Sequence, residues 1–391
     1  MKRPRSVLPA SQSNIPIPPI TMSKRVSVIV IGGSHAGLAV SHKLLRQTPK
    51  AAITLISPSD DKYLYSIPDA FREYPEGFFT FVKGLVTKID YTTKSVAVVL
   101  SAGSPAATTA SSYNFDYLVI ASGSSTPATL GKEGVRLPFK VTAFEDLRKA
   151  IYEAQAKLAG AQRVVIGGAG PLGVEIAGEL AEAPGFKKVT LVSRSNVLLE
   201  GATAPMQRTA MSLLKSKNVD VLTGTTVEGA EYESRTQKWK VKLSTGKTYT
   251  ADAYIATTGT VPNNEFIPKD YLNSQGWVNV DEQLRVVENG VSRSDTYAIG
   301  DITCHPYRLL SRVSLQGQTV ASNITAAIER NSRIMTYSTE AQKKMMVVPV
   351  GQSTGTGHLG GWTLFGCLVW FFKGKDFLTY EAPKFLRGHM R

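Results

Sequence analysis

The chain has 391 residues, of which 42% are hydrophobic and 19% are charged, and it carries a formal net charge of +14. This length and composition predict a soluble globular protein of about two to three domains with a large buried core. Its two cysteines, Cys304 and Cys367, lie far apart, which argues against a disulfide framework, a zinc site or a redox dithiol.

Residues 1–22 are predicted to form a disordered tail. They are rich in Ser and Pro, which opposes a mitochondrial presequence, and they contain no apolar run that fits a signal peptide. The excess of Lys and Arg at both ends of the chain suggests contact with anionic lipid or with nucleic acid, while simple solubility explains the N-terminal excess equally well. We therefore expect a cytoplasmic protein, with peripheral contact to a membrane or lipid surface as an addition and a mitochondrial location disfavoured.

The stretch Val26–Leu45 predicts a strand, a glycine turn and a helix in that order. Val26–Ile31 is apolar and β-branched, as in a buried parallel strand, and apolar residues at helical spacing follow. Gly32 allows the tight turn, Gly37 allows helix and strand to pack closely, and the helix N-terminus offers N–H groups to a pyrophosphate. Ser34 stands where the usual pattern has glycine. Taken alone, the motif also fits a glycine-rich turn in another α/β protein.

A second copy of this motif, at Arg163–Leu180, decides between these readings. Gly168, Gly170 and Gly173 fill all three glycine positions, again after a strand and before a helix. Two such units in one chain indicate two dinucleotide-binding domains.

Further elements are predicted between and after the two motifs. Strands are expected at 52–56, 115–120, 189–192, 253–257 and 296–299, and the strands at 79–86 and 95–100 are expected to form a small sheet. Helices are expected over 143–158, 206–217 and 315–329, a β-meander over 227–250, and an exposed loop over 101–112.

With these motifs the chain resembles the FAD/NAD(P)-dependent pyridine nucleotide oxidoreductases. Within them it is most similar to the group of apoptosis-inducing factor and ferroptosis suppressor protein, which is related to the type II NADH dehydrogenases. The resemblance covers roughly residues 24–378, and the motifs occur in the family's order at Gly32–Gly37, Asp116–Ser124, Gly167–Glu179, Thr257–Asn263 and Tyr297–Asp301.

The resemblance implies an α/β fold of two nested Rossmann-like dinucleotide-binding domains, one for FAD and one for NAD(P)H, with a C-terminal segment packing on the FAD domain. The FAD domain is expected at 23–137 and 262–337, and the NAD(P)H domain at 138–261. Residues 338–391 are expected to form a segment that contacts the electron acceptor or a membrane interface.

The same resemblance assigns residues to FAD. Asp301 is expected to accept a hydrogen bond from the ribityl chain, and Val86 to contact the adenine through its backbone. The expected FAD-binding residues are Gly32, Gly33, Ser34, His35, Ala36, Gly37, Val86, Ala121, Ser122, Gly123, Gly300 and Asp301.

The second motif is expected to bind NADPH or NADH. An acid at the end of its second strand would repel a 2′-phosphate, but this chain has Ser193 followed by Arg194, which favours NADPH or dual use over strict NADH. An exposed Arg194 without this role is the alternative, and Glu175 either faces the nicotinamide or is a solvated helix acid. The expected residues of this site and of the domain junction are Gly168, Gly170, Pro171, Leu172, Gly173, Glu175, Ser193, Arg194, Thr258 and Gly259.

Three features depart from the family's pattern. Ser57 stands where an acid usually binds the ribose hydroxyls, with Asp60 and Asp61 close behind. No C-x-x-x-x-C dithiol follows the first helix, which excludes the disulfide reductases. The interval between residue 65 and the strand at 79 is short and lacks the family's arginine beside the flavin, for which Arg72 is a candidate substitute.

Leu364–Phe372 is apolar and aromatic but too short to span a bilayer, and Lys373 and Lys375 follow it. In the family this region covers the far side of the flavin, forms the quinone site and meets the membrane. We expect peripheral membrane contact through this segment, with a core helix that caps the FAD domain as the alternative.

The expected function is transfer of hydride from NAD(P)H to FAD and of electrons onward to a quinone or a similar small acceptor. Hydride transfer needs no acid–base side chain, so no catalytic residue is assigned, and no metal is expected. The alternatives are a reductase of a ferredoxin-like protein and a cell-death effector that binds nucleic acid by charge. The latter lacks the support of a basic run with interleaved aromatic residues. The sequence leaves the oligomeric state open.

Overall fold

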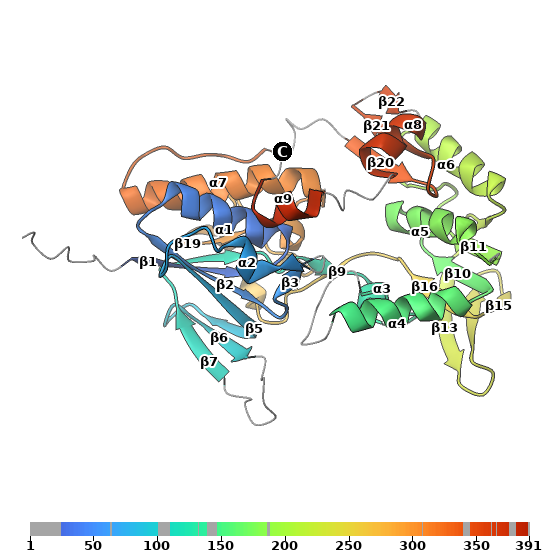
Figure 1. The fold of residues 1–391 in the computed structure, drawn as a ribbon, viewed down its shortest axis with the longest axis horizontal. Coiled ribbons are helices and arrows are strands. Elements are labelled where there is room, and N and C mark those ends of the chain that lie inside the picture. The colour runs from blue at the N-terminus through green and yellow to red at the C-terminus, as the bar shows by residue number, and fades with distance from the viewer. Residues whose placement is uncertain are drawn as a thin grey trace, which may run out of the picture.

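Figure 1 shows the chain folded into two lobes, each built around its own β-sheet. The computed structural model describes residues 25–389 except 63–64, 101–109, 132, 139–146, 186–187, 307, 339–344, 361, 365 and 375–380. The predicted tail and most of the predicted loop at 101–112 therefore lie outside the described residues.

The first lobe is built on an eight-stranded sheet with the strand order β18-β19-β8-β1-β2-β5-β6-β7. Strand β1 pairs in parallel with β2 and β8, and β19 continues the parallel part beside β8. The strands are β1 (Val26–Ile31), β2 (Ala51–Ser57), β5 (Phe79–Asp90), β6 (Ser95–Leu100), β7 (Ala110–Asn114), β8 (Tyr117–Ile120), β18 (Arg285–Glu288) and β19 (Val291–Ala298).

Helices α1 (His35–Gln47) and α7 (Leu310–Glu329) lie side by side on one face of this sheet (Figure 1). Alternate residues of β1 explain this two-sided burial, because successive side chains of a strand point to opposite faces. Val28 and Val30 join the core beneath the helices, while Ile29 and Ile31 join the core on the other face. The apolar run that predicted a fully buried strand therefore serves two cores at once.

The strands at β5 and β6 do not form a small sheet of their own, which corrects the sequence prediction. The first half of β5 pairs in parallel with β2, and its second half, from Gly84 on, pairs antiparallel with β6, with a register shift between Val86 and Lys88. A single strand of 12 residues is long enough to do both, so the β6–β7 hairpin continues the main sheet.

The second lobe contains a four-stranded sheet with the order β12-β11-β10-β16, in which all neighbours are parallel. Val164 and Ile166 of β10 face a core formed with the helices, whereas Val165 faces the three-stranded meander β13–β15. The elements are α4 (Leu147–Gly160), β10 (Arg163–Gly167), α5 (Pro171–Glu182), β11 (Lys188–Val192), α6 (Ala204–Ser216), β12 (Asp220–Leu222), β13 (Val227–Glu233), β14 (Lys238–Leu243), β15 (Thr248–Ala251) and β16 (Ala253–Ala256).

The C-terminal segment is divided between the two lobes. The antiparallel sheet of β20 (Met345–Pro349), β21 (Gly355–Leu359) and β22 (Trp362–Leu364) packs on α5 and α6 of the second lobe (Figure 1). Helix α9 (Ala382–Leu386) packs on α1 of the first lobe. The contact predicted between the C-terminal segment and the first lobe is thus made by α9, while the preceding sheet packs on the second lobe.

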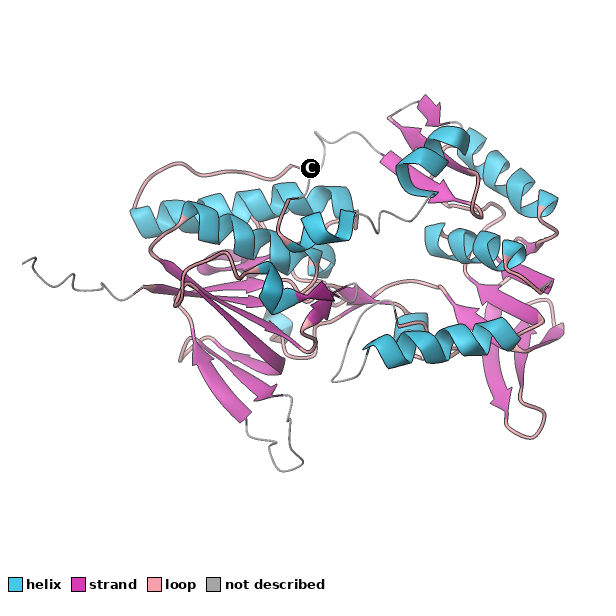
Figure 2. Ribbon diagram, viewed as in Figure 1, coloured by secondary structure: helices cyan, strands magenta, loops and turns pink. Residues whose placement is uncertain are grey.

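Short elements complete the fold, and Figure 2 shows them between the larger strands and helices. Strand β9 pairs antiparallel with β17 between the lobes. These elements are β3 (Asp61–Lys62), β4 (Tyr65–Ser66), α2 (Ile67–Ala70), β9 (Ser124–Ser125), α3 (Pro127–Leu130), β17 (Val261–Pro262), the 3-10 helices η1 (Lys269–Tyr271) and η2 (Gly300–Ile302), α8 (Gly366–Val369) and a π-helical turn η3 (Trp370–Gly374). Within the described part of the chain, no helix combines the length and apolar character needed to cross a membrane.

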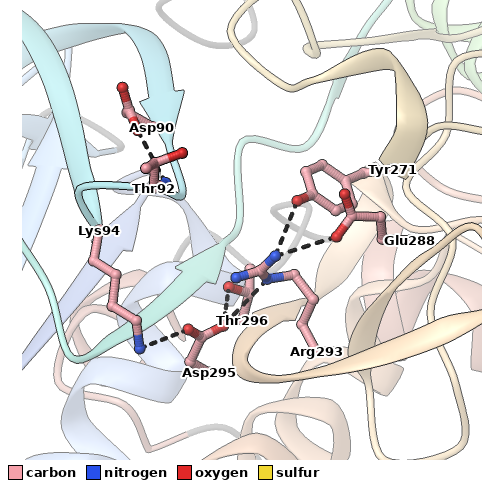
Figure 3. A network of polar contacts seen from close by, with 8 residues as sticks. All are labelled: Asp90, Thr92, Lys94, Tyr271, Glu288, Arg293, Asp295 and Thr296. Carbon is pink, nitrogen blue, oxygen red and sulfur yellow. Dashed lines mark hydrogen bonds and ion pairs between the residues drawn. The ribbon is translucent and has the colours of Figure 1, made fainter.

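A polar network fixes the turn after β5 to the β18–β19 hairpin (Figure 3). Arg293 donates from Nη1 to Glu288 Oε2 at 3.2 Å and from Nε to Asp295 Oδ1 at 3.3 Å, and its guanidinium lies over the ring of Tyr91. The other carboxylate oxygen of Asp295 pairs with Lys94 at 2.8 Å. The network therefore joins elements that are distant in both sequence and strand order.

Asp295 is ionised in this network. Burial opposes its ionisation, but the hydrogen bonds from Lys94 and Thr296 and the charge of Arg293 outweigh burial, so the pKa of Asp295 lies below its usual value. A carboxylate whose pKa is lower in the folded than in the unfolded protein stabilises the fold at pH values above its unfolded-state pKa. That contribution is lost as the pH falls through the folded-state pKa.

We predict that Asp295→Asn lowers the free energy of unfolding in urea at neutral pH by about 1.5–3 kcal/mol, because it removes charge-assisted hydrogen bonds. The difference from wild type should begin to shrink as the pH falls below about 4, where this carboxyl becomes protonated in the unfolded chain, and should be lost as the pH falls through the lower folded-state pKa. Asp270→Asn, at an exposed acid, is the matched control. A deficit of equal size at acid and neutral pH would contradict the role given to the carboxylate charge.

Candidate functional site

The turn between β1 and α1 depends on two glycines. Gly32 has φ +114°, and a Cβ at this position would overlap the carbonyl oxygen of Ala121. A Cβ at Gly37 would overlap the carbonyl oxygen of Gly32, so helix and turn touch only because no side chain intervenes. This is the close approach that the sequence motif predicted.

The N-terminus of α1 is arranged for an anion. Ser34 is the N-cap in extended conformation, its hydroxyl makes no capping bond, and the first turn carries no acidic residue. The N–H groups and the positive end of the helix dipole therefore face the turn without a competing side-chain carboxylate on that helix. Such an N-terminus binds phosphate groups in dinucleotide-binding folds.

A cavity of about 630 Å³ opens at this helix N-terminus. Its volume lies within the range of cofactor and ligand clefts, which is roughly 300–1,000 Å³. Every predicted FAD residue except Gly37 lines it, and Gly37 lies directly beneath the turn. The predicted residues on its wall are Gly32, Gly33, Ser34, His35, Ala36, Val86, Ala121, Ser122, Gly123, Gly300 and Asp301.

Asp301 reaches the cavity from the turn that follows β19. The Gly300 N–H donates to Gln316 Oε1 at 2.8 Å, which ties this turn to α7. The carboxylate of Asp301 accepts a hydrogen bond from Ser124 Oγ at 3.2 Å. Because β1, β8 and β19 are parallel neighbours, the residues that follow all three strands meet at one edge of the sheet.

The cavity wall also contains cations that the sequence did not reveal. Lys62 comes from β3 and Arg308 from the segment before α7. Arg308 donates from Nε to the carbonyl of Asp301 at 3.2 Å, and its guanidinium stacks on Trp277 at 3.5 Å. Neither residue belongs to a sequence motif, so only the fold could place them at this cavity.

Arg72 does not take the place of the missing arginine. It pairs with Asp69 at 2.7 Å on the surface, with a side chain 78% exposed, and it is not part of the cavity wall. The arginine beside the predicted flavin site is Arg308, which comes from a different part of the chain.

The end of β2 carries a serine in place of the usual acid. Ser57 is buried and so close to the turn that a Cβ at Gly33 would lie 2.7 Å from its hydroxyl oxygen. Of the two acids that follow, Asp61 lines the cavity and Asp60 pairs with Lys83 at 2.8 Å. Asp61 is therefore the carboxylate placed to reach a ribose at this site.

These features together fit FAD. A turn that only glycine can form, an uncommitted helix N-terminus, cations and an acid line one cavity of suitable size. The polar groups match the phosphates and hydroxyls of a dinucleotide, and the apolar residues Ile31, Leu130 and Phe266 on the same wall match its rings.

The second cradle repeats the geometry of the first. Gly168 has φ +109°, and a Cβ at Gly173 would overlap the carbonyl oxygen of Gly168. Thr257 at the end of β16 donates from Oγ1 to the carbonyl of Gly168 at 2.8 Å and thereby closes the turn. Gly170 is the N-cap of α5, and Pro171 and Leu172 form its first turn, as the motif predicted.

Ser193 and Arg194 lie where β11 ends beside this cradle. Ser193 is buried and donates from Oγ to the carbonyl of Val197 at 3.0 Å, which shapes the loop. Arg194 is exposed at the end of the strand. The loop is thus stabilised by the serine and presents the arginine outward.

Glu175 forms an ion pair with the C-terminal segment. Its Oε1 lies 2.6 Å from Nζ of Lys373 in the π-helical turn. Burial raises the pKa of Glu175 against the opposing effect of Lys373. Glu175 is therefore not a solvated helix acid, and its carboxylate joins α5 to the turn that follows α8.

The two lobes meet at a short junction held by Asn263. Its side chain donates from Nδ2 to the carbonyl of Ser122 at 2.8 Å, and its Oδ1 accepts from Ser125 at 2.7 Å. The Ser122 hydroxyl in turn donates to the Asn263 carbonyl at 2.8 Å. Thr258 and Gly259 lie just before this junction, between β16 and β17, where the resemblance placed them.

Comparison with known proteins gives a family match over most of the chain. The sequence model described as pyridine nucleotide-disulphide oxidoreductase matches residues 26–330. Oxidoreductase ptaL of Pestalotiopsis fici is 30% identical over 93% of this chain and 99% of its own length. Human ferroptosis suppressor protein 1 is 24% identical over 93% of this chain and 97% of its own length.

Solved structures agree in fold. An NAD-dependent persulfide reductase from A. fulgidus is superimposable with a TM-score of 0.64 at 21% identity, over 85% of this chain and 63% of that protein. An engineered water-forming NADPH oxidase gives a TM-score of 0.63 at 20% identity, over 83% of this chain and 73% of that protein. These likenesses confirm the predicted α/β fold with Rossmann-type domains.

We predict that Asp301→Ala weakens FAD binding about 10- to 100-fold, which corresponds to the loss of one or more hydrogen bonds to a charged group. The variant should lose flavin on dialysis, measured as flavin absorbance per mole of protein. Asp301→Asn, which keeps an acceptor oxygen, should retain more flavin than the alanine variant. Full retention of reducible flavin by Asp301→Ala would contradict the role of this residue.

Proposed function

Because the chain belongs to the pyridine nucleotide-disulphide oxidoreductase family, we propose that it oxidises NAD(P)H through FAD and passes the electrons to a quinone or a similar small acceptor. The family uses FAD and NAD(P)H, which confirms the cofactors expected from the two cradles. The chain is thus a pyridine nucleotide-dependent flavin oxidoreductase, and the identity of the acceptor is the proposed part.

The observation that carries the proposal is the chain's lack of a dithiol. The sequence contains two cysteines, Cys304 and Cys367, which are both free thiols, and neither lines the cavity. Members that reduce disulfides through their own cysteine pair need two thiols beside the flavin. The lack of a cysteine pair therefore favours transfer of electrons from the flavin to an external acceptor, and a quinone can take up the two electrons directly.

The protein's part in the reaction is binding and orientation. FAD supplies the hydride-accepting chemistry when it is bound. The N-terminus of α1 would hold the phosphates of FAD, and Asp301 and Asp61 on the cavity wall would accept hydrogen bonds from its hydroxyls. The second cradle binds the nicotinamide nucleotide, and the hydrogen bonds of Asn263 hold the two lobes at one relative position. No side chain has to transfer a proton for hydride transfer.

NADPH is the donor that Ser193 and Arg194 favour. A carboxylate at this strand end would repel a 2′-phosphate, whereas an exposed guanidinium binds it with charge-assisted hydrogen bonds. NADH remains a substrate under this proposal, because both nucleotides share the contacts of the second cradle.

A lipid surface is the proposed source of the acceptor. In the C-terminal segment Trp362 is 83% exposed and Phe371 is 69% exposed, with Leu368 and Trp370 also exposed. Exposed Trp, Phe and Leu side chains insert into the boundary between the headgroups and the acyl chains of a bilayer. This part of the chain is not one helix, because it contains β22, α8 and the π-helical turn. It is only partly core, because Val369 is buried whereas the four side chains named above are exposed.

The lysines contribute less to lipid binding than the sequence suggested. Lys373 is paired with Glu175, and Lys384 pairs with Glu381 at 2.9 Å. Lys375 lies outside the described residues. The proposed membrane contact therefore depends on the exposed aromatic side chains more than on positive charge.

We predict that the purified protein, made anaerobic, is reduced by NADPH faster than by NADH and is reoxidised by a water-soluble quinone. The measurement is the bleaching and return of the flavin absorbance in a stopped-flow spectrometer. A disulfide and a ferredoxin are tested in the same way as alternative acceptors, and buffer without an acceptor is the blank. Reoxidation by the ferredoxin or the disulfide, with none by the quinone, would overturn the proposal.

We predict that the double variant Trp362→Ser with Phe371→Ser loses co-sedimentation with vesicles of phosphatidylcholine and phosphatidylserine, because it removes the two most exposed rings among the described residues of the segment. It should keep its flavin and still reduce a water-soluble quinone. Tyr152→Ser, at an exposed ring of α4, is the matched control. The proposed lipid contact would be rejected if wild type does not sediment with vesicles, or if the double variant sediments as well as wild type.

A further inference from the structure

Helix α9 packs on α1 although the two helices are formed by opposite ends of the chain. Figure 1 shows α9 beside α1 on the first lobe. Ala382 and Leu386 of α9 are buried, and Leu386 belongs to the same hydrophobic core as Leu38 and Val40 of α1. The position of α9 is therefore fixed by core packing.

Two side chains of α1 bind the last carbonyl groups of α9. His42 donates from Nε2 to the carbonyl of Leu386 at 2.7 Å, and Arg46 donates from Nη2 to the carbonyl of Arg387 at 2.6 Å. Carbonyls at a helix C-terminus have no partner within the helix, so these bonds satisfy them. Gly388, with φ +69°, lets the chain pass so close to His42 that a Cβ there would lie 2.6 Å from the histidine Cβ.

His42 is held in one protonation state by its surroundings. Its ring is fully buried, stacks on Phe71 at 3.9 Å and has its Nδ1 2.8 Å from the hydroxyl of Tyr74. Since the Leu386 carbonyl can only accept, Nε2 carries the proton and Nδ1 accepts from Tyr74. Burial lowers the pKa of His42 to about 3, so the neutral ring keeps both bonds at neutral pH.

The other side of α9 contacts the cavity wall. The ring of Phe385 meets the ring of His35 edge-on, with centroids 5.9 Å apart and planes at 76°. His35 is the first residue of α1 and lines the cavity at the helix N-terminus. Burial, together with the charge of Lys62, lowers the pKa of His35 to about 3, so this ring is also neutral.

We propose that α9 is part of the FAD site, with Phe385 as a positioning residue that holds His35 at the phosphate-binding end of the cavity. The proposal rests on the assignment of FAD to this cavity and not on the identity of the acceptor. His42 and Arg46 fix α9, and Phe385 transmits that position to His35. FAD binding and the docking of α9 on α1 are then linked equilibria. Because linkage is reciprocal, bound FAD also stabilises the docked position of α9.

A double-mutant cycle on FAD affinity tests the contact directly. Phe385→Ala should raise the dissociation constant of FAD about two- to tenfold, the range of an aromatic pair, measured by titrating the apoprotein with FAD. In a His35→Ala background the same substitution should have no further effect, since its effect acts through His35. Phe385→Tyr should restore the affinity, and Lys384→Ala, at the neighbouring surface residue of α9, is the matched control.

An unchanged FAD affinity in Phe385→Ala would overturn the proposal, as would an equal loss with and without His35. If Phe385→Ala does not fold, amide hydrogen exchange of the wild-type protein with and without FAD tests the proposal instead. Saturating FAD should slow exchange at 385–389 by several-fold while leaving β13–β15 of the second lobe unchanged, and no such slowing would reject the coupling. All of these measurements omit NAD(P)H and acceptor, so a failure of the proposed quinone reaction would not affect them.

Discussion

The steric contact between a helix and the turn before it is the constraint on which both lobes depend. In the first lobe a side chain at Gly37 would overlap the carbonyl of Gly32, and in the second a side chain at Gly173 would overlap the carbonyl of Gly168. Each contact lets a helix N-terminus lie directly at the end of a central parallel strand. This close approach places each helix N-terminus where dinucleotide-binding folds bind a phosphate group.

The remaining site residues gather because parallel strands end at the same edge of a sheet. Ser57 ends β2, Ala121 follows β8 and Gly300 lies just after β19, so segments distant in sequence share one cavity. Charges from irregular segments then complete its wall, with Arg308 held on Trp277 and on the Asp301 carbonyl. The free thiols of the chain stay outside this wall, which is why the proposed electron path ends in a diffusible acceptor.

The C-terminal segment contacts both lobes in turn. Its sheet β20–β22 packs on α5, with Lys373 paired to Glu175, and α9 then packs on α1. A backbone that approaches α5 closely requires Gly178, where a Cβ would lie 2.5 Å from the Gly351 nitrogen. The described parts of the segment thereby contact the lobes of both cradles and also carry the exposed aromatic rings.

The sequence by itself determined the parts of this protein whose cause is local. The β-branched runs, the glycine positions and the polar residues after each strand predicted both cradles and the α/β class, because each depends on neighbours within a few residues, while the resemblance to a known family implied FAD and NAD(P)H as the cofactors. The meander at β13–β15 was predicted for the same reason, since alternation and turns recur over a short span. Only the tertiary structure decided what depends on contacts between distant residues. It joined β5 to both β2 and β6, placed Arg308 rather than Arg72 at the cavity, paired Glu175 with Lys373, and set α9 on His42. None of these contacts leaves a periodic trace in the sequence, because each is fixed by how separate elements pack and by which buried polar groups can satisfy one another.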